Sequence, residues 1–237
     1  MGSKIGFTAR FGIPARRNPK ENENMRSEPK RLFPHPSIRR LPSYLRLLRQ
    51  LRLEGGQKIS CTRIARELDL DSTQVRKDLA LTGITGRPRI GYELAPLIIA
   101  IETFLGWDQV MDSFLVGAGS LGHALIGYEN FTNCGMNIVA AFDVAEDKIG
   151  REIHGRKIYH LNDMPAMAKS HNVTVGVLTV PAHAAQAAAN IMISSGLAGI
   201  WNFAPVKLDA PENVLIENVE LVSSLAILSV SMMGKSK

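Results

Sequence analysis

The sequence predicts a two-domain α/β protein, in which a small helical domain precedes a larger domain with a parallel β-sheet. Residues 41–83 have the apolar spacing of three short helices, whereas from Phe114 onward apolar β-prone runs alternate with helical ones. The charge divides in the same way. Residues 1–92 carry 20 Lys/Arg against 8 Asp/Glu, a balance of +12, and the remaining residues have a balance of −6. We therefore expect a polyanionic partner for the first domain.

Residues 1–36 precede the first periodic segment. They are rich in Pro, Asn, Glu and Arg and show no apolar periodicity. Such a composition is typical of a disordered extension, here a basic one. Contact of its basic residues with DNA phosphates is the alternative, and a solvated tail is the favoured interpretation.

Residues 37–95 form the predicted first domain. Four leucines from Leu41 to Leu51 share one face of a first helix, which Gly55-Gly56 ends. Two further short helices follow about four residues apart, and the second has Asp71 or Ser72 as its cap. The segment "GITGRPRIGYEL" then has glycines and a proline between short β-prone pieces, as in a hairpin. A helix-turn-helix followed by a basic hairpin predicts a winged-helix domain.

The third helix, "STQVRKDLALTG", has the polar residues of a DNA-reading helix. Val75 and Leu79 point inward at i, i+4 and leave the polar side chains outside. Gln can pair with adenine, Arg or Lys with guanine, and hairpin arginines suit a minor groove or its phosphates. An ordinary solvated helix is the alternative. The DNA-binding candidates are Ser72, Thr73, Gln74, Arg76, Lys77, Arg87 and Arg89.

The stretch "FLVGAGSLGHAL" has the form of a phosphate-binding loop. Gly117, Gly119 and Gly122 are spaced as G-x-G-x-x-G between a strand-like and a helix-like run. The first glycine permits a tight turn, the second a close approach of pyrophosphate, and the third close packing of the helix on the strand. A tight glycine turn without a ligand is the alternative. Asp143 ends the next strand, 21 residues beyond Gly122, where a carboxylate can accept hydrogen bonds from ribose hydroxyls.

Asp143 also predicts the choice of cofactor. A carboxylate at this place repels a 2′-phosphate, and no Arg follows closely to neutralise one, so NAD(H) is favoured over NADP(H). Residues 96–219 form the predicted Rossmann-type domain, in which the segments after two later strands lie at the nucleotide edge. The candidate cofactor-binding residues from these patterns are Gly117, Ala118, Gly119, Ser120, Leu121, Gly122, Asp143, Thr179, Val180, Pro181, Asn202 and Phe203.

An NAD-dependent oxidoreductase with an incidental basic N-terminal segment is the alternative function. A dehydrogenase needs an acid or base beside the hydride acceptor and groups that hold the substrate. The sequence has no Tyr-x-x-x-Lys pair and no second domain large enough for a substrate cleft, so we expect binding without turnover. Cys61 and Cys134 form no metal-binding pattern, and no apolar run is long enough for a membrane helix. We expect a cytoplasmic protein without metal or membrane contact.

Residues 220–237 form a predicted C-terminal helix and tail. Leu221, Leu225, Leu228 and Met232 lie along one stripe, and other apolar residues widen it. A helix this apolar needs cover on most sides, which a partner subunit can provide. Burial within its own domain is the alternative.

The whole pattern resembles the Rex family of redox-sensing transcriptional repressors from about Ile38 to Met233. The resemblance is carried by "RLPSYLRLLRQL", "STQVRKDLALTG", "RIGYEL", "VGAGSLGHAL", "AAFDV", "LTVPAHAAQ" and "WNFAPVKL". It implies a homodimer that binds palindromic operator DNA through winged helices and senses the NADH/NAD+ ratio through Rossmann-type domains. It also implies release of DNA when NADH binds, and exchange of the C-terminal helix between subunits.

The resemblance further implies three switch residues. Tyr128 is similar to a family tyrosine near the nicotinamide, and Arg46 to an arginine that couples the two domains. Glu220 stands where the family usually has Asp. We expect Arg46 and Glu220 to pair in the DNA-binding arrangement. Reduced nicotinamide, with Tyr128 repositioned, is expected to favour a closed arrangement without that pair.

Overall fold

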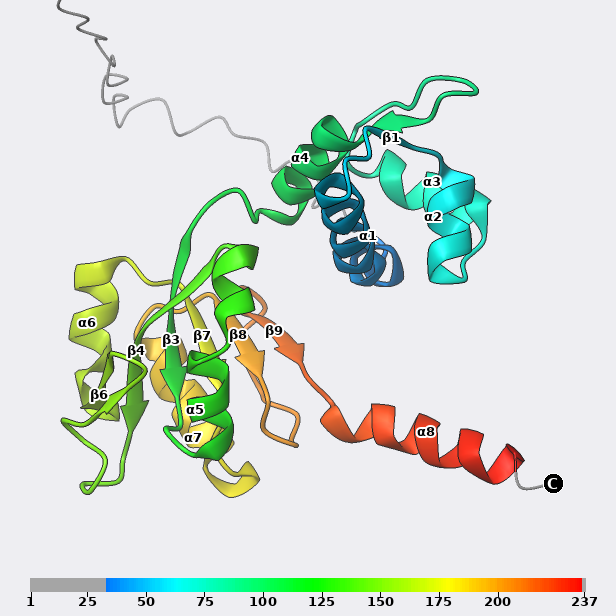
Figure 1. The fold of residues 1–237 in the computed structure, drawn as a ribbon. Coiled ribbons are helices and arrows are strands. Elements are labelled where there is room, and N and C mark those ends of the chain that lie inside the picture. Colours follow the sequence, from blue (N-terminus) through cyan, green and yellow to red (C-terminus); the bar gives the residue numbers. More distant parts are fainter. Residues whose placement is uncertain (1–32, 236–237) are drawn as a thin grey trace, which may run out of the picture.

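The computed structural model describes residues 33–235, which fold into a helical domain and a sheet domain joined by one connection (Figure 1). The predicted extension lies outside the described residues up to residue 32. Helix α1, His35–Leu53, begins two residues before the predicted boundary at residue 37. Pro36 explains this start, because a proline in the first turn has a suitable fixed φ and needs no hydrogen-bond partner for a backbone N–H.

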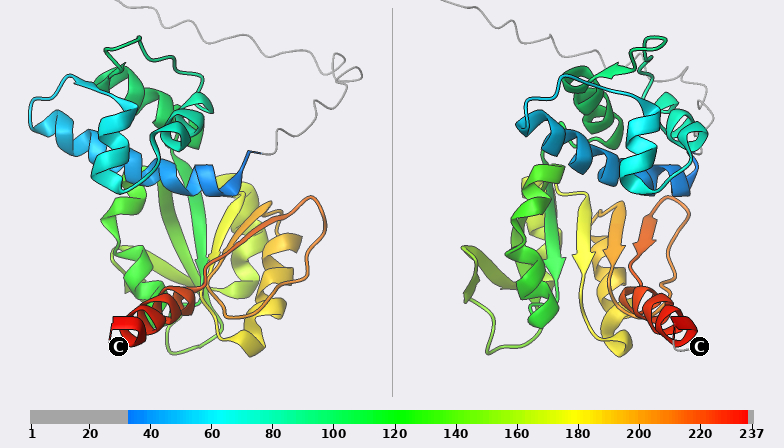
Figure 2. Two further views of the ribbon diagram at one scale, coloured as in Figure 1. Left: turned by 90° about the vertical axis from the view of Figure 1, so that its right-hand side faces the viewer. Right: turned by 45° about the vertical axis from the view of Figure 1, so that its right-hand side comes forward.

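The helical domain has the predicted helix-turn-helix and wing. Its four helices share one apolar core, and its two short strands pair antiparallel. The fourth helix therefore packs with this domain, although residues from 96 onward were predicted to belong to the sheet domain. A β-bridge between Arg87 and Gly91 closes the loop that forms the wing. Helix α1 lies on the side of this domain nearest to the sheet domain (Figure 2). The remaining elements are β1 Lys58–Ile59, α2 Cys61–Leu68, α3 Ser72–Ala80, β2 Tyr92–Glu93 and α4 Leu94–Leu105.

The sheet domain contains a seven-stranded sheet with the order β5-β6-β4-β3-β7-β8-β9. All neighbours are parallel except β5 and β6, which pair antiparallel. The predicted parallel sheet is therefore confirmed, whereas the short edge strand β5 was not predicted. The strands are β3 Met111–Val116, β4 Met136–Asp143, β5 Glu152–Ile153, β6 Arg156–His160, β7 Val175–Leu178, β8 Gly199–Asn202 and β9 Leu215–Asn218.

Both faces of the sheet are covered, because successive side chains of a strand point to opposite faces. Phe114 and Val116 pack in the core that includes residues of α6 and α7, whereas Leu115 packs in the core that includes residues of α5 and η2. Strand β3 pairs with both β4 and β7, so the chain changes direction on the sheet there and a crevice opens at the carboxyl ends. The helices are α5 Ser120–Ile126, η2 Glu129–Cys134, η3 Leu161–Asp163, α6 Met164–His171 and α7 Ala182–Ser194.

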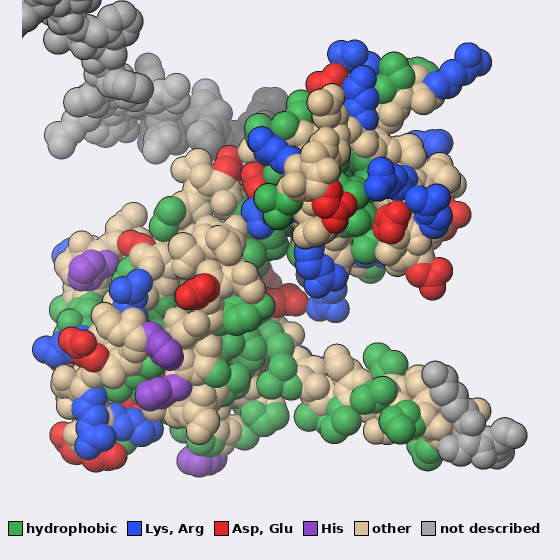
Figure 3. Space-filling model, in the orientation of Figure 1, with side chains coloured by type: hydrophobic (Ala, Val, Ile, Leu, Met, Phe, Trp, Pro, Cys, Tyr) green, Lys and Arg blue, Asp and Glu red, His purple; other side chains and the backbone are tan. Residues whose placement is uncertain are grey.

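The C-terminal helix α8, Leu221–Lys235, projects away from the sheet domain (Figure 1). Its apolar side chains are uncovered in the single chain (Figure 3); Leu225 is 59% exposed and Leu228 56%. The alternative that this helix is buried within its own domain is therefore wrong. An apolar helix without its own cover supports the expectation that a partner subunit covers it.

Candidate nucleotide-binding and DNA-binding sites

The glycine loop joins β3 to α5 with the predicted geometry. Gly117 has a φ of +103°, and a Cβ there would lie 2.9 Å from the backbone of Thr179. A Cβ on Gly122 would collide with the carbonyl oxygen of Gly117, so the start of α5 can pack on the loop only without a side chain. A Cβ on Gly119 would meet open space, and no side chain caps α5. The loop is therefore tightly packed on its inner side and open on its outer side.

Thr179 fastens this loop to the next strand. Its Oγ1 donates to the carbonyl oxygens of Val116 at 3.0 Å and Gly117 at 2.8 Å. Val180 and Pro181 follow directly and lead into α7. The structure thus brings together the predicted cofactor-binding residues that follow β3 and β7, at the carboxyl edge of the sheet.

Asp143 is 9% exposed and braces the loop from the end of β4. One carboxylate oxygen accepts from the backbone N–H of Val144 at 2.8 Å and Ala145 at 3.0 Å. The other accepts from the N–H of Ala118 at 2.8 Å and from Lys148 Nζ at 2.9 Å. Burial alone would raise the pKa of Asp143, but the hydrogen bonds from Lys148 and the backbone lower it below its ordinary value. Asp143 is thus ionised near neutral pH.

Lys148 corrects one part of the cofactor argument. No Arg follows Asp143 closely enough to neutralise a 2′-phosphate, but a lysine five residues beyond Asp143 pairs with that carboxylate. The short distance of Lys148 from the end of β4 in the sequence was the one hint of this contact. Apolar periodicity does not show the turn that brings the lysine back to Asp143. The carboxylate remains beside the loop, so the preference for NAD(H) stays a prediction.

A small apolar cavity of about 190 Å³ adjoins Asp143. Its walls include Gly117, Val144, Leu161 and Val180. A cavity with apolar walls next to a carboxylate suits an adenine ring whose ribose lies beside Asp143. This arrangement supports the prediction that the crevice takes a dinucleotide.

Aromatic side chains connect the predicted nicotinamide end to the sheet. Tyr128 packs edge-on against Phe131 at 4.9 Å between ring centroids, and Phe131 against Trp201 at 5.3 Å. Trp201 packs in turn against Phe203 at 4.8 Å. Tyr128 is half exposed at the open end of this row, so its ring is accessible to a ligand.

Asn202 has a different role from the one its position suggested. It is fully buried, and its amide nitrogen donates to the carbonyl oxygen of Val206 and to Asn218 Oδ1. Its Oδ1 accepts from the N–H of Ala204. The side chain therefore shapes the end of β8, and a direct contact of Asn202 with the cofactor stays a prediction.

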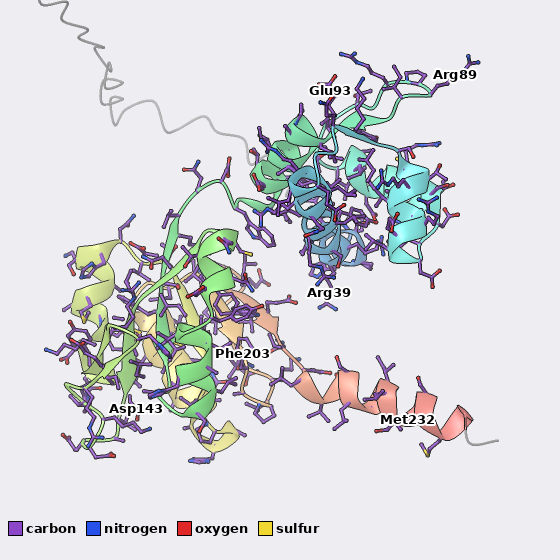
Figure 4. All side chains as sticks on the ribbon, viewed as in Figure 1. Arg39, Arg89, Glu93, Asp143, Phe203 and Met232 are labelled. Carbon is purple, nitrogen blue, oxygen red and sulfur yellow. The ribbon has the colours of Figure 1, made fainter. Side chains whose placement is uncertain are left out.

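Three of the DNA-binding candidates line a hollow of about 630 Å³ beside the wing. Arg76 of α3 lines it together with Arg87 and Arg89 of the wing loop. Arg89 lies at the tip of this loop (Figure 4), where its φ is +63°. Thr73 and Lys77 are exposed on α3, and Ser72 is partly buried. Three arginines around one hollow give this face the positive charge that phosphates require.

Asp71 confirms the predicted cap of α3, and Gln74 adds a contact that the sequence did not suggest. Asp71 Oδ1 accepts from the N–H of Thr73 at 2.8 Å and Gln74 at 3.0 Å. The Gln74 side chain turns toward the protein, and its Nε2 donates to the buried Asp78 at 2.8 Å. Arg40 and Tyr44 of α1 bind the same carboxylate.

The predicted switch pair is separated within one chain. Arg46 is exposed on α1, and Glu220 is exposed before α8, where it accepts from Ser223 Oγ at 2.7 Å. Among the described residues, α1 and β9 are joined instead by Arg39 and Glu217, with 3.0 Å between Nη2 and Oε1. Arg46–Glu220 pairing thus stays a prediction for the dimer.

Residues 33–235 contain neither a metal site nor a membrane-spanning helix. Among these residues, no group of His, Cys, Asp or Glu side chains has the arrangement of a metal site. Nor does any helix within that range have the length and apolar character needed to cross a membrane.

Two family models match the two domains separately. Residues 33–80 match the model described as "Putative DNA-binding protein N-terminus". Residues 109–206 match the model described as "CoA binding domain".

Relatives cover most of the chain. It is 44% identical to the redox-sensing transcriptional repressor Rex of Treponema denticola over 200 residues, 84% of this chain and 95% of that protein. It is 38% identical to the Rex protein of Bacteroides thetaiotaomicron over 208 residues, 88% of this chain and 94% of that protein. Among solved structures, RSP in complex with β-NAD+ and operator DNA has a TM-score of 0.81 at 29% identity, with 87% of this chain and 95% of that chain covered. RSP in complex with β-NADH has a TM-score of 0.79 at 28% identity, with 87% and 97% covered.

A dinucleotide crevice and a basic winged helix in one chain define a DNA-binding regulator controlled by a nucleotide. The relatives narrow this class. The chain belongs to the Rex family of redox-sensing transcriptional repressors. These relatives are repressors rather than enzymes, so the oxidoreductase alternative is rejected.

Proposed function

We propose that this chain, as a homodimer in the cytoplasm, represses transcription by binding palindromic operator DNA and releases the DNA when NADH binds. The observation that carries the proposal is the position of α1, which contacts both the DNA-reading helix and the sheet domain. This helix bonds to the DNA-reading helix through Arg40 and Asp78, and to the sheet domain through Arg39 and Glu217. A change in the sheet domain can therefore alter the orientation of the DNA-binding face.

The nucleotide assignments follow the geometry of the crevice. Gly117, Gly119 and Gly122 leave the outer side of the loop to the pyrophosphate, while Asp143 lies beside the adenosine ribose. Tyr128 lies at the nicotinamide end. NADH and NAD+ differ in charge at that ring, and a ligand shifts an equilibrium only through different affinities for the two states. The switch must therefore operate near the exposed Tyr128 ring.

A mobility-shift assay on a library of palindromic promoter sequences, with and without NADH, tests this function. We expect retention of selected sequences without NADH and their release when NADH is added. Asp143→Ala should raise the NADH concentration needed for release about tenfold or more, because a hydrogen bond to a charged group contributes about 1.5–3 kcal/mol. It should also reduce the discrimination against NADPH.

Asp147→Ala is the matched control, because it removes an exposed carboxylate from the same loop. Its NADH titration should overlay that of the unmodified protein. Failure of every sequence to bind, or retention of DNA at saturating NADH, would reject the proposed function.

A further inference from the structure

Asp78 is a fully buried carboxylate on the inner face of α3. Arg40 of α1 grips it with both ends of its guanidinium, with Nε at 2.7 Å from Oδ2 and Nη2 at 2.9 Å from Oδ1. The hydroxyl of Tyr44 donates to Oδ2 at 2.6 Å, and Nε2 of Gln74 donates to Oδ1 at 2.8 Å. Each carboxylate oxygen thus accepts two hydrogen bonds.

These contacts keep Asp78 ionised. Burial is the largest influence and would raise the pKa of this group, but the donors from Arg40, Tyr44, Ser37 and Gln74 together lower it to about 2. An ionised carboxylate can only accept hydrogen bonds. Whatever lies against its oxygens must therefore be a donor.

This requirement settles the orientation of the Gln74 amide. The N–H2 end must face Asp78, because the carbonyl end would bring two acceptors together. The carbonyl oxygen and one remaining N–H are then left for a ligand. One acceptor and one donor in this order match the N6 amino group and N7 of adenine in the major groove.

We propose that Asp78 is a positioning residue for sequence recognition, which fixes the amide of Gln74 so that this side chain selects adenine. The inference rests on the proposed function, because it requires α3 to lie in the major groove. Arg40 and Tyr44 hold Asp78 from α1, so the DNA-reading side chain is anchored to the helix that also contacts the sheet domain. Thr73, Arg76 and Lys77 are free of this constraint and contact DNA independently of Asp78.

The test measures the affinity of the full-length protein for its selected operator and for every single-base replacement in one half-site. Gln74→Ala should abolish the preference for adenine at one position, where the unmodified protein discriminates roughly 5- to 150-fold. Asp78→Asn should relax the preference at that same position, because an asparagine can face either end of the Gln74 amide. The double variant Asp78→Asn/Gln74→Ala should lose no further preference there.

Tyr44→Phe is the matched control, because it removes one donor from Asp78 and leaves the Asp78–Gln74 hydrogen bond in place. It should lower the melting temperature yet keep the base preference. If Asp78 has a purely structural role, Asp78→Asn and Tyr44→Phe should each weaken binding to all operator sequences by the same factor. A folded Asp78→Asn protein with an unchanged preference would overturn the proposal.

The side-chain amide of Gln74 gives a second measurement that does not need Asp78→Asn to fold. In the unmodified protein, NMR should show a Gln74 amide proton that exchanges slowly with water, identified by its absence in Gln74→Leu. Fast exchange typical of a solvated glutamine would reject the hydrogen bond. If the unmodified protein does not bind operator DNA at all, the proposed function is rejected. If Gln74→Ala keeps the full preference for adenine, only the role of Gln74 is rejected.

Discussion

The helical domain and the C-terminal helix differ in how much of their structure one chain completes. In the helical domain, Tyr44 and Asp78 are fully buried and their polar atoms are satisfied by neighbours from the same chain. In α8, by contrast, Leu225 and Leu228 are more than half exposed although the helix is strongly apolar. One chain therefore satisfies the buried polar groups of its DNA-binding domain by itself, whereas the apolar surface of α8 needs a second subunit to cover it.

This difference suits a ligand-controlled repressor. The DNA-reading surface needs a fixed geometry, which a satisfied buried network provides. The sensor needs two arrangements of similar free energy, and an interface between subunits can supply them by rigid-body rotation. We therefore expect the conformational change to occur mainly between domains and subunits, with the contacts around Asp78 preserved.

The largest expected effect comes from disrupting the contact of α8 with a second subunit. Leu225→Asp should prevent the apolar stripe from packing against a partner, at a cost of about 1.5–3 kcal/mol for each leucine and twice that for the dimer. Analytical ultracentrifugation should show a shift from dimer to monomer at micromolar concentration, and palindromic operator affinity should fall with it. Ser231→Asp, which adds the same charge at a polar position of α8, should stay dimeric. A dimeric Leu225→Asp protein would show that α8 is covered in some other way.

A smaller effect is expected from pH, which tests the buried contacts of Asp78 in the helical domain. The pKa of Asp78 is lowered to about 2 from 3.8, so its stabilising contribution is complete only above about pH 5 and is lost progressively as the pH falls through 2. The shift corresponds to about 2 kcal/mol in the free energy of unfolding. Urea unfolding between pH 5 and 2 should show this loss in a Trp201→Phe background, in which Trp107 beside the helical core reports on that domain.

The same titration with Asp78→Asn provides the control. Asp71 remains in that variant, and its pKa is also lowered, first by the backbone N–H of Gln74 and then by that of Thr73. The difference between the two proteins therefore isolates Asp78. Parallel curves would mean that Asp78 is not held as a charged group in the folded state.

Local patterns predicted most of the fold. The glycine spacing from Gly117 to Gly122, the position of Asp143 and the alternation of strands and helices depend on neighbours in sequence, and the structure places them as expected. The same applies to the cap of α3 at Asp71. Short-range geometry of this kind is readable from one sequence.

Contacts between distant residues were not predictable in this way. Arg40 and Asp78 are 38 positions apart, and Arg39 and Glu217 are 178 apart. Nothing in the periodicity of either segment shows that their side chains meet. The arginines of α1 look alike in sequence, so only the packing of α1 on α3 and near β9 separates the partly buried Arg40, which bonds to Asp78, from the surface pair of Arg39.

The smallest expected effect concerns that surface pair and separates it from the switch between subunits. Arg39 and Glu217 are 71% and 55% exposed, so a double-mutant cycle with Arg39→Ala and Glu217→Ala should give a coupling of about 0.2–1 kcal/mol in unfolding, reduced by salt. Because both residues belong to one chain, this coupling should persist in the monomeric Leu225→Asp protein.

The Arg46→Ala and Glu220→Ala cycle should instead show coupling in operator affinity only in the dimer and only without NADH. By linkage, operator DNA must weaken NADH binding by the same factor as NADH weakens operator binding. Equal coupling of Arg46 and Glu220 in monomer and dimer would place their interaction within one chain, and no coupling in either would reject this switch while leaving NADH-controlled repression intact.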